Sequence, residues 1–540
     1  MRLFLFLFLF LTFPFAAEYD LKTLRIKENS LAKDYYIHRL LEEKKINKKE
    51  AQNLANHIFR YVGKIKTEFE KLVPVQTYID PAYAPCFNYN KKTILDANLT
   101  CKNYRSNSLY FISSLDKTTR TKLAKELKQN YPNSAFKLEA FNQDNPLAYS
   151  AQKLNSSAFL QFYDYFKNND LVLSDEFVNE LAKHGSFKTF AQNIIIKKKN
   201  PKIRASLVNI NPQIVKEDTA FYLGVNALLH DEEKQAFAFF QQAYLSFKMS
   251  YTKDNALFWM YLISKNEQYL ETLAQSNSLN IYALYAKELR NKPFPEIIVL
   301  TADDKKSNFD LLDPFLWQNL NKQIQNADEA ELLKLAKQFN SQHTLAIYAY
   351  IMERVSKFKK NYFIMPYFEY LKDYPVQRQA LIMAIARQES RFIPTAISTS
   401  YALGVMQFMP FLANHIGQKE LKIPNFDQDE VFKPEVAYYF ANHHLNYLET
   451  YLNSPVFVAY AYNGGIGFTR RMLERPDMFK EGKYEPFLSM ELVPYQESRI
   501  YAKKVLANYI VYQALLNDNI KISSIFENLI QNKANLANKL

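Results

Sequence analysis

The residue of this chain best suited to acid–base chemistry is Glu389, the single acidic residue in the apolar stretch 381–410. Ile382 and Ile385 precede it by seven and four positions, which on a helix places its carboxyl group on the apolar face. Pro394 prevents the helix from continuing far, so the carboxyl group also lies near the negative end of the helix dipole. Burial and the dipole both disfavour the anion, so we expect an elevated pKa, as a general acid requires.

Two simpler interpretations compete for this glutamate. Glu389 could form an ion pair with Arg387 or Arg391, or it could face solvent, as most helical glutamates do. A glycosidase with two acids places its second carboxylate about 5 to 9.5 Å from the first. The segment 390–419 contains no Asp or Glu. Acids occur farther along the sequence, at Asp427, Asp429, Glu491 and Glu497. Position in the sequence therefore does not decide whether one of these acids lies close enough to Glu389 to act as a second catalytic acid.

Four short motifs follow one another over about 110 residues of the C-terminal region. They are Glu-Ser at 389–390, Gly-Val-Met-Gln-Phe-Met-Pro at 404–410, Ala-Tyr-Asn-Gly-Gly at 461–465 and Glu-Leu-Val-Pro-Tyr-Gln-Glu-Ser-Arg at 491–499. An ordered set of motifs is far more specific than any one short pattern. In these motifs the chain resembles the soluble lytic murein transglycosylases.

The resemblance implies an enzyme that cleaves peptidoglycan with one glutamate. Glu389 would protonate the oxygen of the β-1,4 bond between N-acetylmuramic acid and N-acetylglucosamine. It would then accept the proton of the muramoyl C6 hydroxyl, which attacks C1 of its own sugar and leaves a 1,6-anhydro end. Because the attacking group is held on the same ring, its effective molarity is high and a second carboxylate is dispensable.

Two alternatives stay open. One is a lysozyme-like muramidase, a hydrolase that activates water with a second acid such as Asp427 or Glu491. The other is a superhelical peptidoglycan-binding scaffold with an inactive lysozyme-like domain. The presence of both Glu389 and Gln407 argues against the scaffold.

The resemblance also implies a saccharide groove. Its expected lining residues are Ser398, Met406, Gln407, Met409, Tyr462, Asn463 and Glu491. Gln407 would bond sugar groups, the Tyr462 hydroxyl would reach Glu389 or the substrate, and Asn463 would fix its loop. Glu491 would orient the acetamido group. For Met406, packing in the core is the competing interpretation and the one we favour.

Some positions depart from the family pattern. Tyr401 stands where the family usually has glycine. Ala437, Ala441 and His444 replace an Asn, a Gly and a Tyr that are often seen in the helix after the Phe-x-Pro-Glu element at 432–435. These changes affect the expected groove width and helix packing but leave Glu389 untouched.

The 540 residues are too many for one core, since domains average roughly 150 residues. With 48% hydrophobic residues, 9 Gly and 21 Pro, the composition indicates a mainly helical protein. Helix pairs are expected at 220–229 with 232–247 and at 255–264 with 267–274, followed by a helix at 281–289. A spacing near 35 residues is typical of helical hairpins that stack into a superhelix.

Together with this pattern, the family resemblance predicts a fold class and an order of domains. We expect a mainly all-α protein with an α-superhelical ring module, a helical linker and a C-terminal lysozyme-like α+β catalytic domain. The expected boundaries are 18–292 for the superhelical domain, 293–361 for the linker with a helix at 327–339, and 362–540 for the catalytic domain.

The first 17 residues are typical of a secretory signal peptide, with a positive charge at Arg2, an apolar run at 3–15 and Ala16-Ala17 at the end. We expect cleavage near Ala17 and a periplasmic protein, with an uncleaved anchor as the alternative. In such an oxidising compartment Cys86 and Cys101 are expected to form a disulfide, the alternative being two buried thiols.

The net charge of +13 suits an anionic partner, although codon bias accounts for dispersed lysines equally well. The expected partners are peptidoglycan glycan strands, with complexes of cell-wall synthesis or of the envelope as a further possibility and a monomer as the expected state. No recognised nucleic-acid-binding module occurs. We expect no cofactor and no metal, because no His or Cys cluster has ligand spacing.

Overall fold

The computed structural model describes residues 19–74, 80–166, 170–303 and 307–537. The predicted signal segment 1–17 lies outside these residues. The chain divides into two compact units. The first unit comprises Met1–Val75, Pro293–Glu474 and Ile500–Leu540, and the second comprises Gln76–Lys292 and Arg475–Arg499. None of the described helices combines the length and apolar composition needed to cross a membrane.

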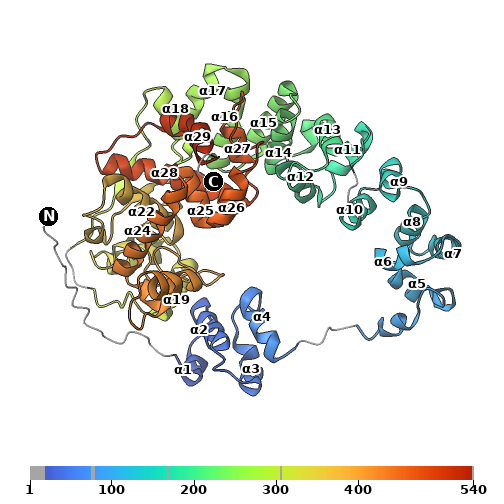
Figure 1. Cartoon of the computed structure of the whole chain (residues 1–540), viewed down its shortest axis with the longest axis horizontal. Helices are drawn as coiled ribbons and strands as arrows, with labels where there is room; N and C mark the ends of the chain where they lie inside the picture. Colours follow the sequence, from blue (N-terminus) through green and yellow to red (C-terminus); the bar gives the residue numbers. More distant parts are fainter. Residues whose placement is uncertain (1–18, 75–79, 167–169, 304–306, 538–540) are drawn as a thin grey trace. The chain divides into compact units, whose positions relative to one another are not determined.

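The second unit is a succession of short helices, each packed on its neighbours in chain order (Figure 1). Asparagine and serine side chains begin many of them, for example Asn155 and Ser174, because their oxygens accept hydrogen bonds from otherwise unpaired backbone N–H groups. The helices are α5 (Leu99–Arg105), α6 (Leu109–Ser114), α7 (Lys117–Leu127), α8 (Pro132–Ala140), α9 (Pro146–Gln152), α10 (Ser156–Tyr165), α11 (Asp175–Ala182), α12 (Phe187–Ile196), α13 (Pro201–Ser206), α14 (Glu217–Leu228), α15 (Glu233–Ser246), α16 (Ser250–Ser264), α17 (Glu267–Ala274), α18 (Ile281–Leu289) and α27 (Phe487–Glu491).

Aromatic packing joins the predicted helix pairs to one another and to α18. Gly224 of α14 lies against the Phe240 ring of α15, where an added Cβ would come within 2.9 Å of the ring. Phe240 stacks on Trp259 of α16 with ring centroids 5.5 Å apart, and Phe258 stacks on Tyr282 of α18 at 4.2 Å. The expected pairs correspond to α14 with α15 and α16 with α17, so the sequence periodicity predicted these elements correctly.

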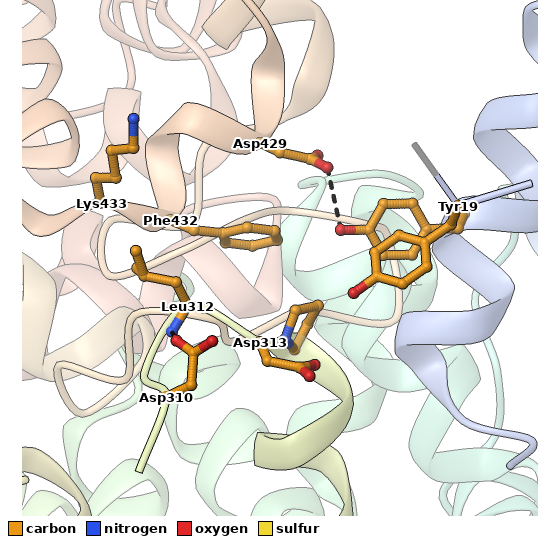
Figure 2. Close-up of a pocket in the computed structure, with 9 residues that line it drawn as sticks. Tyr19, Asp310, Leu312, Asp313, Asp429, Phe432 and Lys433 are labelled. Carbon is orange, nitrogen blue, oxygen red and sulfur yellow. Dashed lines mark hydrogen bonds between the residues drawn. The ribbon is translucent and has the colours of Figure 1, made fainter. Parts of the chain in front are cut away.

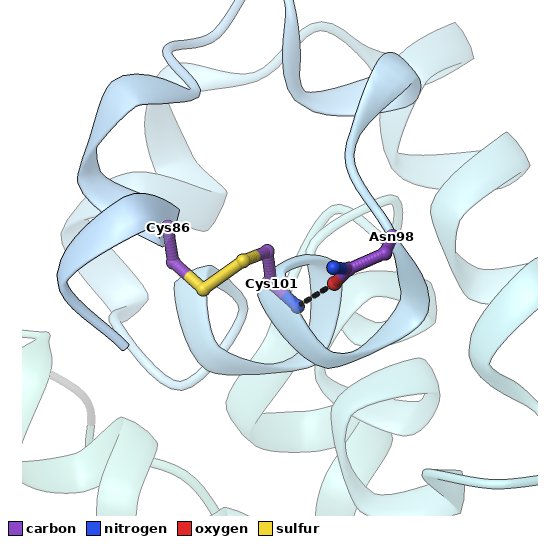
Figure 3. Close-up of a disulfide and its surroundings, with 3 residues drawn as sticks. All are labelled: Cys86, Asn98 and Cys101. Carbon is purple, nitrogen blue, oxygen red and sulfur yellow. Dashed lines mark hydrogen bonds between the residues drawn. A yellow bond between two sulfur atoms is a disulfide. The ribbon is translucent and has the colours of Figure 1, made fainter. Parts of the chain in front are cut away.

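The second unit also contains the predicted disulfide. Cys86 and Cys101 are bonded, with Cα atoms 4.8 Å apart and both side chains buried (Figure 3). The Asn98 side chain caps α5 by accepting a hydrogen bond of 2.8 Å from the Cys101 backbone N–H. The bond therefore joins the start of this helix to the 3₁₀ helix Ala84–Asn88, and it confirms the sequence-based pairing.

The first unit combines helices from three parts of the chain. Its one pair of strands, among the described residues, is parallel: β1 (Ile297–Val299) pairs with β2 (Asn361–Phe363). The helices are α1 (Leu21–Ile26), α2 (Leu31–Glu42), α3 (Lys48–Leu54), α4 (Gly63–Leu72), α19 (Pro314–Asn326), α20 (Glu329–Phe339), α21 (Leu345–Val355), α22 (Val376–Glu389), α23 (Pro410–Asn414), α24 (Pro434–Tyr451), α25 (Pro455–Gly464), α26 (Ile466–Leu473), α28 (Gln496–Leu515) and α29 (Ile522–Ala537).

The observed elements agree with the mainly helical fold expected from the sequence. The helix expected at 327–339 is α20, which begins at Glu329 because Asp328 caps it. One boundary between the compact units, Lys292 to Pro293, coincides with an expected domain boundary. The units differ from the expected domains at two places, since residues 19–74 group with the first unit and residues 475–499 with the second. The domain boundaries themselves stay a prediction.

Candidate active site

Glu389 is the last residue of α22. The preceding segment of this helix, Gln379–Arg387, is buried throughout, so α22 is a central helix of the first unit. The chain turns sharply after it, because Arg391 and Phe392 both adopt positive φ angles, +58° and +66°. The Ser390 hydroxyl secures the turn by donating to the Val405 carbonyl at 2.8 Å. The Glu389 side chain is thereby left partly exposed at the end of a rigid helix.

A tyrosine from a distant helix holds the Glu389 carboxylate. The Tyr501 hydroxyl of α28 donates to Glu389 Oε1 at 2.6 Å. Seven residues later on the same face of α28, Asn508 contacts α22 by accepting a hydrogen bond from Arg387 at 3.1 Å. Helices α22 and α28 therefore lie against each other over two turns, and Tyr501 itself is only 5% exposed.

Arg387 and Arg391 both form ion pairs with Glu353 of α21. Their guanidinium nitrogens lie 3.2 and 3.3 Å from Glu353 Oε1. Burial, and to a lesser degree the charge of Arg391, lowers the pKa of Arg387 to about 10. The two arginines that flank Glu389 in the sequence therefore share the negative charge of Glu353.

The loop that follows α22 is held in place by its backbone conformation and by hydrogen bonds within the loop. Gly404 has a φ of +76°, and a Cβ added there would lie 2.4 Å from the Val431 carbonyl oxygen, so only glycine fits. Gln407 also has a positive φ, +51°, and its side-chain amide donates to the carbonyls of Ala396 and Gly404 at 3.0 and 2.9 Å. Gln407 therefore fixes the loop, in addition to its predicted role in binding sugar groups.

The other loop residues predicted for the groove have different environments. The Ser398 hydroxyl accepts hydrogen bonds from the backbone N–H groups of Ser400 and Ala402 at 3.2 and 2.9 Å, which closes a tight turn. Met406 is fully buried, as the core-packing interpretation expects. Met409 is partly exposed at the start of α23. Of these three residues, Ser398 and Met409 are partly exposed and could contact a ligand, whereas Met406 could not.

Tyr462 lies close to Glu389, and its hydroxyl is hydrogen-bonded to the backbone. Its hydroxyl donates to the Met406 carbonyl at 2.9 Å. Burial, and then the negative charge of Glu389, raises the pKa of Tyr462 well above its usual value. His444 of α24 contacts the Tyr462 ring at 5.8 Å, and burial lowers the pKa of His444 to about 4. Asn463 follows in the last turn of α25 and is partly exposed.

Two of the later acids in the sequence, Asp427 and Asp429, are bound by helix α2. Arg39 donates to Asp427 and lies 3.2 Å from Asp429, and the hydroxyls of Tyr35 and Tyr36 both donate to Asp429. Burial raises the pKa of Asp429 to about 6, although the charge of Arg39 opposes this. The carboxylates of Asp427 and Asp429 therefore bind side chains of α2 and attach this helix to the segment 427–429.

A cavity of about 220 Å³ lies beside this network (Figure 2). Figure 2 shows Tyr19, Asp310, Asp313 and Phe432 around it, with Asp429 hydrogen-bonded to a tyrosine hydroxyl. Burial and the three carboxylates raise the pKa of Tyr19 to about 12. The cavity therefore lies between the N-terminal segment and residues 310–314, and several of its lining side chains are polar.

Helix α2 also contacts the loop after the catalytic helix. Tyr401, which stands where glycine was expected, has a φ of +64° and is 4% exposed. Its ring centroid lies 4.9 Å from His38 and 6.1 Å from Tyr35. Arg60, which lies between α3 and α4, donates to the Thr399 carbonyl at 3.3 Å. The side chain of Tyr401 therefore packs the loop onto α2, which offsets the strain of its backbone.

Glu491 belongs to the second unit. It is the last residue of α27, is 2% exposed and accepts a hydrogen bond of 2.9 Å from the Tyr282 hydroxyl of α18. Arg499 lies in the same unit, where it donates to the Val493 carbonyl and covers the Tyr222 ring. The superhelical helices thus hold the segment that carries Glu491, whose contact with substrate stays a prediction.

Within the ranges that the structure describes, no group of three or more His, Cys, Asp or Glu side chains could hold a metal ion. The sequence did not single out Tyr501, Glu353 or Arg39. For Tyr501 a signal existed, because Tyr501, Asn508 and Tyr512 recur at offsets of seven and eleven and mark one helix face. For Glu353 and Arg39 no local pattern indicates the partner.

Comparisons with known proteins place this site in a family context. Residues 366–484 match the model of the Transglycosylase SLT domain. The chain is 30% identical over 217 residues to the soluble lytic murein transglycosylase of Escherichia coli (strain K12), covering 39% of this chain and 33% of that protein. It is also 30% identical over 215 residues to the Salmonella typhimurium soluble lytic murein transglycosylase, covering 38% and 32%. The chain is matched to about a third of the length of these curated relatives.

A solved structure extends the likeness of the fold. The crystal structure of the 70 kDa soluble lytic transglycosylase from Escherichia coli superimposes with a TM-score of 0.50 at 17% identity, over 93% of this chain and 89% of that one. The chain therefore carries a transglycosylase SLT domain, is homologous to soluble lytic murein transglycosylases over that region, and has a related mainly helical fold.

Proposed function

We propose that this protein is a lytic murein transglycosylase that cleaves the bond between N-acetylmuramic acid and N-acetylglucosamine in peptidoglycan and leaves a 1,6-anhydro end. The observation that carries the proposal is the position of Glu389, a partly exposed carboxylate at the end of a buried helix within the matched domain. Export to the periplasm, where the substrate lies, is part of the same proposal.

In the proposed reaction Glu389 gives its proton to the glycosidic oxygen as the bond from C1 to that oxygen breaks. Charge develops on the sugar at C1. Glu389, now ionised, then takes the proton of the C6 hydroxyl while the C6 oxygen bonds to C1. The proton balance closes on one carboxyl group and no water is consumed, so a second catalytic acid is not required.

Two arrangements in the first unit support a one-acid reaction. The Tyr501 hydroxyl orients the Glu389 carboxylate, which is the state that must act as base. Asp427 and Asp429, two later acids of the first unit, are bound by Arg39 and by tyrosines of α2. Activating water would require one of them to give up these partners.

The test is digestion of purified sacculi in water enriched in oxygen-18, followed by mass spectrometry of the muropeptides. A transglycosylase releases anhydro products that carry no label from the solvent, whereas a muramidase releases reducing ends with one labelled oxygen. The Glu389→Gln variant should lose turnover by several orders of magnitude, because proton transfer alone contributes about 10² to 10⁴. Glu474→Gln, an exposed glutamate at the end of α26, is the matched control and should act like the wild type.

Each alternative gives its own result. Labelled reducing ends would mean that a second acid activates water, and Asp427→Asn and Glu491→Gln would then identify which one. Binding of sacculi without any product would indicate the non-catalytic scaffold. Solubilisation of sacculi by Glu389→Gln at the wild-type rate would overturn the assignment of the acid.

A further inference from the structure

Glu353 of α21 is a buried carboxylate to which the proposed reaction gives no role. Its side chain is only 9% exposed. A single oxygen of this carboxylate, Oε1, lies 3.2 Å from a guanidinium nitrogen of Arg387 and 3.3 Å from one of Arg391. Helix α21 therefore supplies one negative charge to two positive charges, and these two charges come from the catalytic helix α22 and from the turn that follows it.

Both arginines are close to Glu389 in the sequence and are held in fixed positions. Arg387 precedes Glu389 by two residues and Arg391 follows it by two, and successive Cα atoms are 3.8 Å apart. The backbone of each arginine therefore lies within about 8 Å of that of Glu389. Arg387 also donates to the Tyr362 carbonyl of β2 and to the Asn508 side chain of α28, both at 3.1 Å. Its charge cannot move away from this end of α22.

The charges around Glu389 act on the proton that it must donate. Nearby positive charges favour the ionised form of a carboxyl group, and so does a hydroxyl that donates to it, as Tyr501 does. An ionised Glu389 cannot begin the proposed reaction as an acid. The negative charge of Glu353 has the opposite effect on Glu389, because it offsets part of the positive charge of the arginines.

Other ionisable side chains face this cluster of charges from three helices. They are Tyr350 and Arg354 of α21, Tyr462 of α25, and Lys504 and Tyr512 of α28. Burial raises the pKa of each of the three tyrosines above its usual value, so their hydroxyls are neutral. The Arg354 guanidinium lies over the Tyr350 ring at 3.5 Å. Burial, and then the charge of Arg391, lowers the pKa of Lys504. None of these five side chains carries a negative charge, so in this set Glu353 is the one that opposes the arginines.

We propose that Glu353 is a positioning residue for catalysis, which holds Arg387 and Arg391 and offsets their charge so that Glu389 stays protonated at the pH at which the protein acts. The inference rests on the proposed function, in which Glu389 acts first as an acid. Glu353 acts through the two arginines and not on the substrate, since its side chain is buried. Helix α21, which precedes the matched domain, thereby takes part in catalysis.

Two substitutions should change the pH profile in opposite directions. Glu353→Gln keeps the length of the side chain and an oxygen that accepts hydrogen bonds, but it removes the negative charge. The alkaline limb of the kcat/KM profile, where Glu389 loses its proton, should therefore move to lower pH. Arg391→Gln removes a positive charge, so the limb should move to higher pH. Each shift should be about one pH unit, the effect of a unit charge roughly 10 Å away at an effective dielectric constant of about 20.

Three further variants separate the effect of charge from an effect on packing. Glu353→Asp keeps the charge and should have the profile of the wild type. The double variant Glu353→Gln/Arg391→Gln loses one charge of each sign, so its profile should return towards that of the wild type. Glu449→Gln is the matched control, because Glu449 pairs with Arg378 at the other end of α22. It should leave the profile unchanged.

The measurement is the initial rate of cleavage of a soluble peptidoglycan fragment from about pH 4 to 9, since kcat/KM reports the ionisation of the free enzyme. Melting temperatures across the same range establish that each variant is folded. Arg391 is 37% exposed, so Arg391→Gln keeps the test decisive even if Glu353→Gln fails to fold. In that case an alkaline limb that does not move to higher pH in Arg391→Gln contradicts the inference.

The outcomes separate this inference from the proposed function. If the wild type cleaves the fragment and Glu389→Gln does not, the proposed function stands. Glu353 and Arg391 are then merely structural if their variants lose activity with no shift of the alkaline limb, or with shifts in the same direction, and the inference is wrong. If the wild type cleaves the fragment at no pH, the proposed function fails and the inference fails with it.

Discussion

The Tyr501 hydroxyl lies 2.6 Å from Glu389 Oε1, and this bond joins two helix ends that are 112 residues apart in the sequence. Tyr501 is in the first turns of α28 and Glu389 is the last residue of α22. Since α28 also contacts α22 through Asn508 and Arg387, the position of the tyrosine is set by helix packing and not by a flexible loop. The carboxylate is therefore oriented before any ligand binds, as acid–base catalysis requires.

Replacing Tyr501 by phenylalanine should lower kcat about tenfold while the protein stays folded, because the ring remains and only the hydrogen bond is lost. A hydroxyl that donates to a carboxylate favours the ionised form. The alkaline limb of the pH–activity profile should therefore move to higher pH in Tyr501→Phe. Tyr509→Phe on the same helix, where the hydroxyl contacts Gln513, is the control and should leave the profile unchanged. An unshifted profile in Tyr501→Phe would show that the bond does not act on catalysis.

Tyr401 tests whether helix α2 positions the loop that carries Gln407. Tyr401→Gly relieves the positive φ but removes the ring from His38 and Tyr35, so it should reduce kcat/KM by about tenfold and destabilise the protein by about 2 to 4 kcal/mol. Tyr401→Phe keeps the ring and should restore both quantities. Activity is measured on sacculi and stability by urea unfolding. Full activity of Tyr401→Gly would mean that the contact with α2 is dispensable for the loop.

Asp429 should make stability depend on pH in a defined window. Its pKa is about 6 in the folded protein and 3.8 ordinarily, so the folded state binds this proton more tightly than the unfolded state. The contribution of Asp429 to the free energy of unfolding is therefore largest at pH 4 and declines as the pH rises from about 4 to 6. Above this window it is constant, and the total change is about 3 kcal/mol. The groups facing it are Arg39, Tyr35, Tyr36 and Asp427, and Tyr19 lies near.

The measurement is the difference in unfolding free energy between Asp429→Asn and the wild type at pH 4.5 and at pH 7.5. The variant should be relatively more stable at the higher pH. Burial lowers the pKa values of His38 and His444 to about 4. Their contribution to the stability of the protein therefore changes in the opposite direction, because it is lost as the pH falls below 6.5. They are present in both proteins, so their contributions cancel in the difference. A difference that is the same at both pH values would contradict the elevated pKa of Asp429.

The disulfide between Cys86 and Cys101 should stabilise the second unit without affecting catalysis. Closing a loop of this size is worth about 3 kcal/mol on chain-entropy grounds. The Cys86→Ser/Cys101→Ser double variant should melt at a lower temperature than the oxidised wild type and should be insensitive to reductant. Calorimetry with and without dithiothreitol provides the check, and activity on sacculi at 25 °C should be equal. A wild type whose melting is unchanged by reductant would refute this expectation.

The sequence by itself determined the features that depend on neighbouring residues. The apolar periodicity before Glu389 and the proline after it predicted a helix whose C-terminus lies near this glutamate, and α22 ends at Glu389. The helix pairs of the second unit and the bond between Cys86 and Cys101 followed from local spacing in the same way. Periodicity has this power because a helix places residues on its faces by their order alone.

Tertiary structure alone decided which side chains surround the acid. Glu353 is the ion-pair partner of both Arg387 and Arg391. Asp427 is bound by Arg39, which is 388 residues away in the sequence. Tyr501 reaches Glu389 only because two distant helices pack side by side. Such contacts depend on how whole helices pack. A buried charged side chain forms an ion pair with an oppositely charged group that this packing places next to it. No local pattern identifies these partners, so the helix that carries Glu389 was predictable from the sequence and the contacts around its carboxylate were not.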